Sequence, residues 1–115
     1  MIQNNKIKER RLERLQNTIL DIFNHTLKYE IYNKEIKMAS FTYVKLSPDK
    51  INATIYVDTF KRDQIDRVVE TLNESVSVFR RALAENLESR KIPNIIFRKD
   101  ESIDRALYIE NLLKK

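Results

Sequence analysis

The chain contains no glycine, although 115 residues would hold about eight at the average usage of roughly 7%. Phosphate-binding loops, dinucleotide-binding fingerprints, nucleophile elbows and kinase phosphate loops all need glycine where the backbone approaches a ligand or takes a positive φ. None of these sites can be present in its standard form. The missing glycine therefore excludes the commonest nucleotide-dependent enzymes.

Cysteine and histidine usage narrows the chemistry further. The chain has no cysteine, which excludes disulfides, thiolate metal sites and a cysteine nucleophile and fits a reducing compartment. His25 is the only histidine, so a metal cluster or proton relay would have to form around one imidazole. The pair Asp63 and Asp66 fits helix capping better than acid–base catalysis. We expect no enzyme activity, no metal and no cofactor.

Length and charge indicate one small basic domain spanning residues 1–115. Hydrophobic residues make up 42% of the chain, which is enough for a single core, and the net charge of +5 favours an anionic partner. No apolar run approaches the roughly 20 residues that a membrane-spanning helix needs, so we expect a cytoplasmic protein and no membrane partner. Residues 1–5 are polar, and we expect them to be disordered.

The hydrophobic spacing predicts a first helix from Lys6 to Leu27 and then a hairpin. Apolar residues recur every three or four positions along that helix. A β-rich run from Met38 to Leu46 is followed by Ser47-Pro48-Asp49-Lys50, which suits a type I turn. The next run, Ile51 to Val57, alternates apolar and polar residues, so the two runs are expected to pair as antiparallel strands.

The second half predicts two helices, a strand and a last helix. Asp63 and Asp66 resemble a capping box before a helix over residues 65–72. Ser75-Val76-Ser77 is a poor helix former, so we expect a kink there, with Ser77 able to cap the next helix, over residues 78–87. Pro93 ends that helix, residues 95–97 form a third strand, and Asp100 can cap a last helix reaching Leu113.

This order of elements predicts a two-layer α+β domain, because a sheet with one apolar face needs one helical layer. Two strands joined by a turn, with the third reached across two helices, match the K-homology arrangement of the second type.

Short segments in a fixed order also carry a family resemblance. They are Arg11-Leu12-Glu13-Arg14-Leu15, Tyr43-Val44-Lys45-Leu46-Ser47-Pro48-Asp49, Ala53-Thr54-Ile55-Tyr56-Val57, Leu72-Asn73, Phe79-Arg80-Arg81-Ala82-Leu83, Ile92-Pro93-Asn94-Ile95-Ile96-Phe97 and Asp100-Glu101-Ser102-Ile103-Asp104. Along nearly its whole length the chain resembles bacterial ribosome-binding factor A. The resemblance implies a variant K-homology fold that binds the small (30S) ribosomal subunit through 16S rRNA, assists late maturation and rRNA processing, and catalyses no reaction.

The chain departs from the family pattern in two places. Where the family carries Ala-x-Gly at its helix–kink–helix, this chain has Ser75-Val76-Ser77, and serine reaches a left-handed φ less readily than glycine. The usual Asp-Pro pair after the first helix is replaced by Asn33-Lys34-Glu35.

The candidate RNA-binding residues are basic or hydroxylated and flank the predicted kink or the first helix. They are Lys6, Lys8, Arg10, Arg11, Arg14, Ser75, Ser77, Arg80, Arg81, Arg90 and Lys91. The arginines after the kink would lie near free backbone N–H groups, a suitable setting for phosphate. Alternatively, Arg80 and Arg81 form a solvated face paired with Glu85 and Glu88.

Other residues have weaker functional interpretations. Arg98 and Lys99 could extend the basic surface. Tyr43 and Tyr56 could stack on bases if their face of the sheet met RNA, although tyrosines more often simply fill strand faces.

The leading hypothesis is a monomeric RNA-binding assembly factor for the small subunit, with no small-molecule substrate. The alternative is a protein–protein interaction module that acts through the first helix and its extension over residues 29–36. RNA binding requires basic residues of separate segments to converge, whereas an interaction module requires a contiguous exposed apolar patch.

Overall fold

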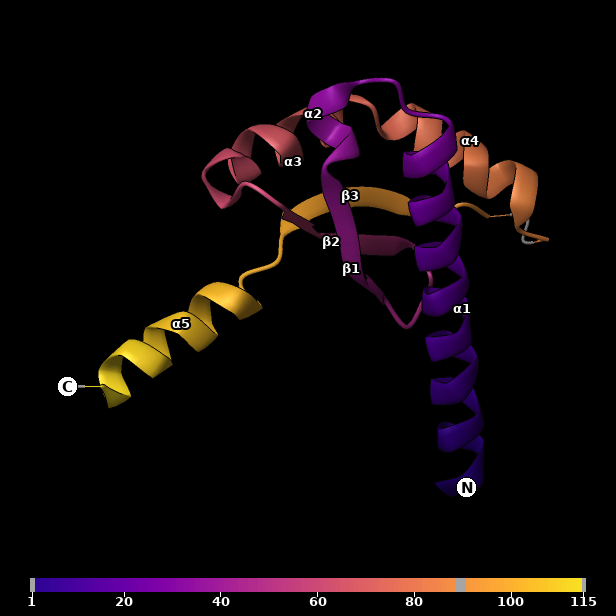
Figure 1. Cartoon of the computed structure of the whole chain (residues 1–115). Coiled ribbons are helices and arrows are strands. Elements are labelled where there is room, and N and C mark those ends of the chain that lie inside the picture. The colour runs from indigo at the N-terminus through magenta and orange to yellow at the C-terminus, as the bar shows by residue number, and fades with distance from the viewer. Residues whose placement is uncertain (1, 89–90, 115) are drawn as a thin grey trace.

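The computed structural model describes residues 2–88 and 91–114, and it shows a three-stranded sheet with helices packed on one face (Figure 1). The elements in chain order are α1 (Ile2–Tyr29), α2 (Lys34–Lys37), β1 (Ala39–Leu46), β2 (Asn52–Thr59), η1 (Arg62–Gln64), α3 (Ile65–Glu74), α4 (Val76–Asn86), β3 (Asn94–Lys99) and α5 (Ser102–Leu113). The predicted α+β order is confirmed, with two short additions, α2 and η1.

The sheet has the order β1-β2-β3, with β1 antiparallel and β3 parallel to β2. The predicted turn between β1 and β2 is confirmed, because the Lys50 N–H donates to the Ser47 carbonyl at 2.8 Å. Lys50 has a φ of 63°, a conformation that favours glycine, in a chain that has none. The parallel β2–β3 pair needs a long crossover, which α3 and α4 supply.

Four phenylalanines hold the helical layer on the sheet. Phe23 of α1, Phe41 of β1, Phe79 of α4 and Phe97 of β3 are almost completely buried. All six ring pairs among them have centroids 5.0 to 6.0 Å apart. Edge-on and tilted aromatic pairs at this spacing add to the free energy of area burial. The quartet therefore fixes α1 and α4 over both outer strands.

Two asparagine side chains hydrogen-bond the backbone of the outer strands, at Phe41 and at Phe97. Asn24 of α1 accepts from the Phe41 N–H at 3.3 Å and donates to the Phe41 carbonyl at 3.4 Å. Asn73, at the end of α3, accepts from the Phe97 N–H at 2.9 Å and donates to the Phe97 carbonyl at 3.1 Å. Each amide satisfies backbone groups that an edge strand leaves unpaired.

The predicted interruption between the two central helices is confirmed, and it consists of Ser75 alone. Its backbone has φ −101° and ψ 14°, so the bend forms without a positive φ. The Ser75 N–H donates to the carbonyls of Thr71 and Leu72, and the Val78 N–H donates to the Ser75 carbonyl. A serine can therefore occupy this bend without the conformational freedom of glycine.

Two predicted helix caps do not form as expected. Ser77 lies inside α4 rather than before it, and Ser75, which precedes α4, makes no side-chain cap. Asp63 and Asp66 do not form a capping box, because η1 occupies the residues between Lys61 and α3 and the residue preceding α3 is Gln64, which makes no side-chain cap.

Asp100 comes closer to its predicted capping role before α5. Its carboxylate accepts from the Ser102 N–H at 2.9 Å, and also from the Thr42 hydroxyl at 2.6 Å. The hydrogen bonds from Thr42 and then from Ser102 hold the pKa of the Asp100 carboxyl below its usual value. The bond from Thr42 also links β1 to the start of α5.

The two terminal helices extend beyond the sheet. α1 begins at Ile2, so residues 2–5 are helical rather than disordered as expected, and no proline or glycine precedes Lys6 to stop the helix. α5 projects away from the sheet on the other side (Figure 1). Among the described residues, no helix is both long and apolar enough to cross a membrane.

Phe79→Ala should lower the free energy of unfolding by about 3–5 kcal/mol, because it opens a cavity that faces three other rings. Phe60 is 85% exposed and serves as the matched control, for which Phe60→Ala should change stability by only about 0.5 kcal/mol. Chemical denaturation of both variants measures the difference. Equal losses in free energy of unfolding would show that the four phenylalanine rings do not stabilise the core.

Ser75→Ala and Ser77→Ala should each change the free energy of unfolding by less than about 0.5 kcal/mol, because neither hydroxyl caps a helix. Asn33→Ala is the comparison, since the Asn33 side chain accepts from the Glu35 N–H at 2.9 Å at the start of α2. That variant should lose about 1 kcal/mol. A loss of this size at Ser75 would contradict the absence of a cap.

Candidate nucleic-acid interface

Two adjacent arginines stand on the outer side of α4. The helix buries Phe79, Ala82 and Leu83 against the core, which leaves Arg80 and Arg81 exposed. Within residues 2–88 and 91–114, neither arginine forms an ion pair, so the predicted alternative of pairing with Glu85 and Glu88 is not seen. Both guanidinium groups are available to an anionic partner.

The bend adds backbone donors next to these arginines. Val76 and Ser77 open α4, and in the described part of the chain no backbone acceptor pairs with their N–H groups. Ser77 precedes Arg81 by four residues, so the two side chains share one exposed face of the helix. A phosphate on this face would meet a hydroxyl, a guanidinium and the positive end of the α4 dipole.

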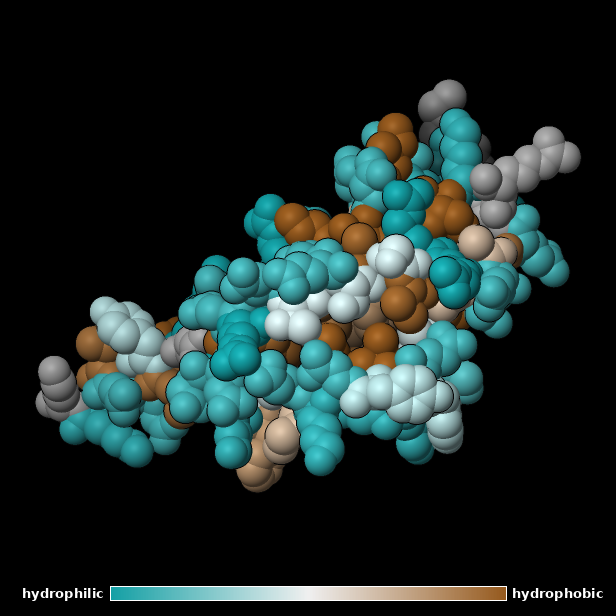
Figure 2. Space-filling view, turned by 90° about the horizontal axis from the view of Figure 1, so that it is seen from above, coloured by the Kyte–Doolittle hydropathy of each residue, from teal (hydrophilic) through white to brown (hydrophobic). Residues whose placement is uncertain are grey.

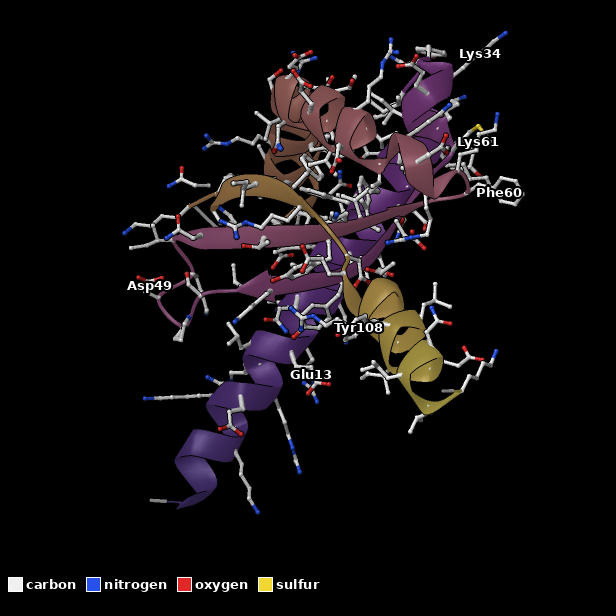
Figure 3. The ribbon with its side chains drawn as sticks, turned by 90° about the vertical axis from the view of Figure 1, so that its left-hand side faces the viewer. Glu13, Lys34, Asp49, Phe60, Lys61 and Tyr108 are labelled. Carbon is white, nitrogen blue, oxygen red and sulfur yellow. The ribbon has the colours of Figure 1, made fainter. Side chains whose placement is uncertain are left out.

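The five cations of α1 divide into two stripes. Lys8 and Arg11 precede Leu15 by seven and four residues, so they share its face of the helix. Lys6, Arg10 and Arg14 are spaced four apart and form a second stripe, about a third of a turn away. All five are exposed, and Figure 3 shows nitrogen-tipped side chains leaving this part of α1 for solvent.

The Lys8 stripe points toward the segment that follows α4. Leu15 lines a small hollow together with Leu87, Lys50 and Lys91. The structure therefore brings Lys91 toward α1, as the predicted basic surface requires, and adds Lys50, which sequence reasoning missed because it lies in the β1–β2 turn. The predicted site residue Arg90 lies outside the described residues.

Two acidic residues lie close to the second stripe. Glu9 and Glu13 follow Lys6 by three and seven residues, so they border the stripe of Lys6, Arg10 and Arg14. Among the residues that the structure describes, none of the five cations on α1 forms an ion pair. The basic surface is defined here as Lys8, Arg11, Lys50, Arg80, Arg81 and Lys91, which belong to α1, the β1–β2 turn, α4 and the segment after α4.

The extension of the first helix is less suited to partner binding than expected. Ile31 and Ile36 are buried in the core, and Tyr29 and Tyr32 are the exposed large hydrophobic residues of residues 29–36. The exposed apolar side chains instead gather on α5, where Figure 2 shows brown residues at the projecting left-hand end. They are Leu107, Tyr108, Ile109, Leu112 and Leu113.

Comparison with known proteins agrees with this architecture. The family model of ribosome-binding factor A matches residues 9–113. Ribosome-binding factor A of Mycoplasma pneumoniae is 46% identical over 101 residues, which cover 88% of this chain and 87% of that protein.

Two known structures share the fold. The crystal structure of ribosome-binding factor A from Thermus thermophilus superposes with a TM-score of 0.72 at 16% identity, covering 79% of this chain and 97% of that one. A homology model of the Thermus thermophilus factor, fitted into a cryo-EM map of a 30S-RbfA complex, gives a TM-score of 0.63 at 17% identity and covers 76% and 93%. By the family match over residues 9–113 and the identity to a relative along most of both chains, this chain belongs to the ribosome-binding factor A family.

Proposed function

We propose that this protein is a cytoplasmic RNA-binding assembly factor that binds the small ribosomal subunit as a monomer, through 16S rRNA, and assists its late maturation and rRNA processing. It acts by binding rather than by catalysis. The observation that carries the proposal is the exposure of basic side chains on separate segments, of which Lys8, Arg11, Arg80 and Arg81 form no ion pair within the described residues.

Family membership supports the same partner. The Thermus thermophilus factor, whose fold this chain shares, was fitted into a map of a 30S-RbfA complex. A relative that is 46% identical over most of both chains carries the name ribosome-binding factor A. We extend ribosome binding from these proteins to this chain.

The proposed mechanism is electrostatic binding to rRNA phosphates, with one phosphate held at a fixed position on the protein. Arg80 and Arg81 neutralise backbone phosphates and release condensed counterions, which supplies sequence-independent affinity. The bend at Ser75 starts a new helix, and the N–H groups of its first turn can position one phosphate relative to the protein. The Phe79 contacts keep α4 in that orientation.

Reversing both arginines of α4 should weaken binding to small subunits. Wild-type co-sedimentation across a salt series should give log K against log salt a slope of about −4 to −5, as expected for about four to six phosphate contacts. The Arg80→Glu/Arg81→Glu variant should bind more weakly and with a slope smaller in magnitude by up to about 2, while its melting temperature stays near that of wild type.

The control for this experiment carries the same charge change on α2, as Lys34→Glu/Lys37→Glu, and should bind nearly as well as wild type. Both lysines are exposed, so the fold should tolerate the change. Equal weakening by the two double variants, or a flat salt response of wild type, would contradict the proposed site.

The two stripes of α1 provide a second, internally matched test. Lys8→Glu/Arg11→Glu reverses charges on the stripe that continues to Leu15 and Lys91, so it should weaken subunit binding strongly. Lys6→Glu/Arg10→Glu makes the same charge change one or two residues away on the other stripe and should have a smaller effect. Competition binding against labelled wild-type protein measures the affinity of both double variants for small subunits. A larger loss in Lys6→Glu/Arg10→Glu would place the partner on the face of α1 that carries Lys6, Arg10 and Arg14.

A further inference from the structure

The face of the sheet opposite the helices is open. α1, α3 and α4 all pack on the other face, and α5 makes few contacts with the rest of the domain. The strand register places Tyr43, Tyr56 and Arg98 side by side across β1, β2 and β3. The neighbouring row is Lys45, Thr54 and Ile96. These six residues are defined here as the open sheet face.

The two tyrosines present their rings as a pair. A β-bulge between Phe41 and Tyr43 shifts the alternation of β1, so Thr42 and Tyr43 are both exposed after the buried Phe41. The rings of Tyr43 and Tyr56 are 6.0 Å apart at their centroids, inclined by 32°, and Tyr43 is 51% exposed. Each ring can therefore offer a surface to a planar group.

Lys45 and Arg98 are the two charged residues among these six, while Asp58, which follows Tyr56 by two residues on the same face of β2, pairs with Arg62. In the part of the chain that the structure describes, Lys45 and Arg98 form no ion pair. Carboxylates do border a hollow beside this face, but Asp100 accepts from Thr42 and Ser102, and Glu101 pairs with Arg105 at 3.6 Å. Asp66 of α3 also lines this hollow, and Lys99 adds a further cation.

We propose that the open sheet face binds single-stranded RNA, with unpaired bases stacked on Tyr43 and Tyr56 and their phosphates held by Lys45 and Arg98. Aromatic pairs on an exposed sheet are a known means of binding unpaired bases, and flanking cations neutralise the backbone. The proposal deepens the proposed function, on which it rests for the source of the strand. It names a second RNA surface, separate from the basic surface of α1 and α4.

A protein segment fits this face less well. Ile96 is its only aliphatic side chain, whereas the core of a protein interface is rich in apolar residues and poor in charge. Its paired aromatic rings and the cations beside them instead match the composition of single-strand nucleic-acid grooves.

The test uses the full chain and a fluorescein-labelled oligouridylate, which forms no duplex, with binding followed by fluorescence anisotropy at low salt. Tyr43→Leu and Tyr56→Leu should each weaken binding about tenfold or more, because each removes a stacking ring. Tyr43→Phe keeps the ring and should stay within about threefold of wild type. Tyr32→Leu makes the same change at a tyrosine that is 85% exposed outside the sheet, and it should leave binding unchanged.

The result that overturns the proposal is wild-type oligouridylate binding by the two leucine variants, with circular dichroism confirming that they are folded. Should either leucine variant fail to fold, the ring proton resonances of Tyr43 and Tyr56 in the wild-type chain decide the matter, and resonances that do not shift on titration overturn it. If Arg80→Glu/Arg81→Glu loses oligouridylate binding and the leucine variants keep it, the RNA binds at α4, and the proposal for the open sheet face is overturned as well.

The failures of the two proposals are distinguishable in the same set of proteins. Oligouridylate binding that depends on the tyrosines, without co-sedimentation with small subunits, would contradict only the proposed function. Co-sedimentation that depends on Arg80 and Arg81, without oligouridylate binding, would contradict only the proposal for the open sheet face.

Discussion

The mutual contact of four phenylalanine rings is the interaction on which the rest of this structure depends. Phe23 and Phe79 come from the helical layer and Phe41 and Phe97 from the outer strands, so one cluster links four elements that are distant in sequence. Arg80 and Arg81 directly follow Phe79, and the burial of that ring directs them to solvent. The exposure of these two arginines is therefore a consequence of core packing.

Much of the fold follows from local patterns in the sequence. The period of the apolar residues predicts α1 and β2, and the Ser47-Pro48-Asp49-Lys50 turn is present with its expected hydrogen bond. The predicted bend is also present. It lies at Ser75, a poor helix former that separates the end of α3 from the start of α4. Helix caps were less predictable, because a side chain can cap a helix only if the preceding backbone places it beside the first N–H groups. The short helix η1 precedes α3, and no serine side chain caps α4.

Features that depend on tertiary contact could not be predicted. Asn24 and Asn73 look like ordinary helix residues in sequence, yet each pairs with the edge of a strand 17 or 24 residues away. The exposure of Tyr43 depends on a β-bulge in β1, which the pattern of apolar and polar residues in the sequence does not indicate. For the site, residue type and helical spacing identified the cations of α1 and α4, but the approach of Lys91 and Lys50 to Leu15 required the fold.

Site-specific photo-crosslinking from α4 to a bound small subunit shows whether α4 contacts 16S rRNA. A benzophenone side chain at Ser77 lies on the exposed face that also carries Arg81, whereas one at Phe60 occupies an exposed loop between β2 and η1. Both proteins are bound to subunits and irradiated, and the crosslinked partner is then identified. We expect crosslinks to 16S rRNA from position 77 and few from position 60. Crosslinks from position 77 to ribosomal protein alone, or equal rRNA crosslinking from both positions, would contradict the proposed contact.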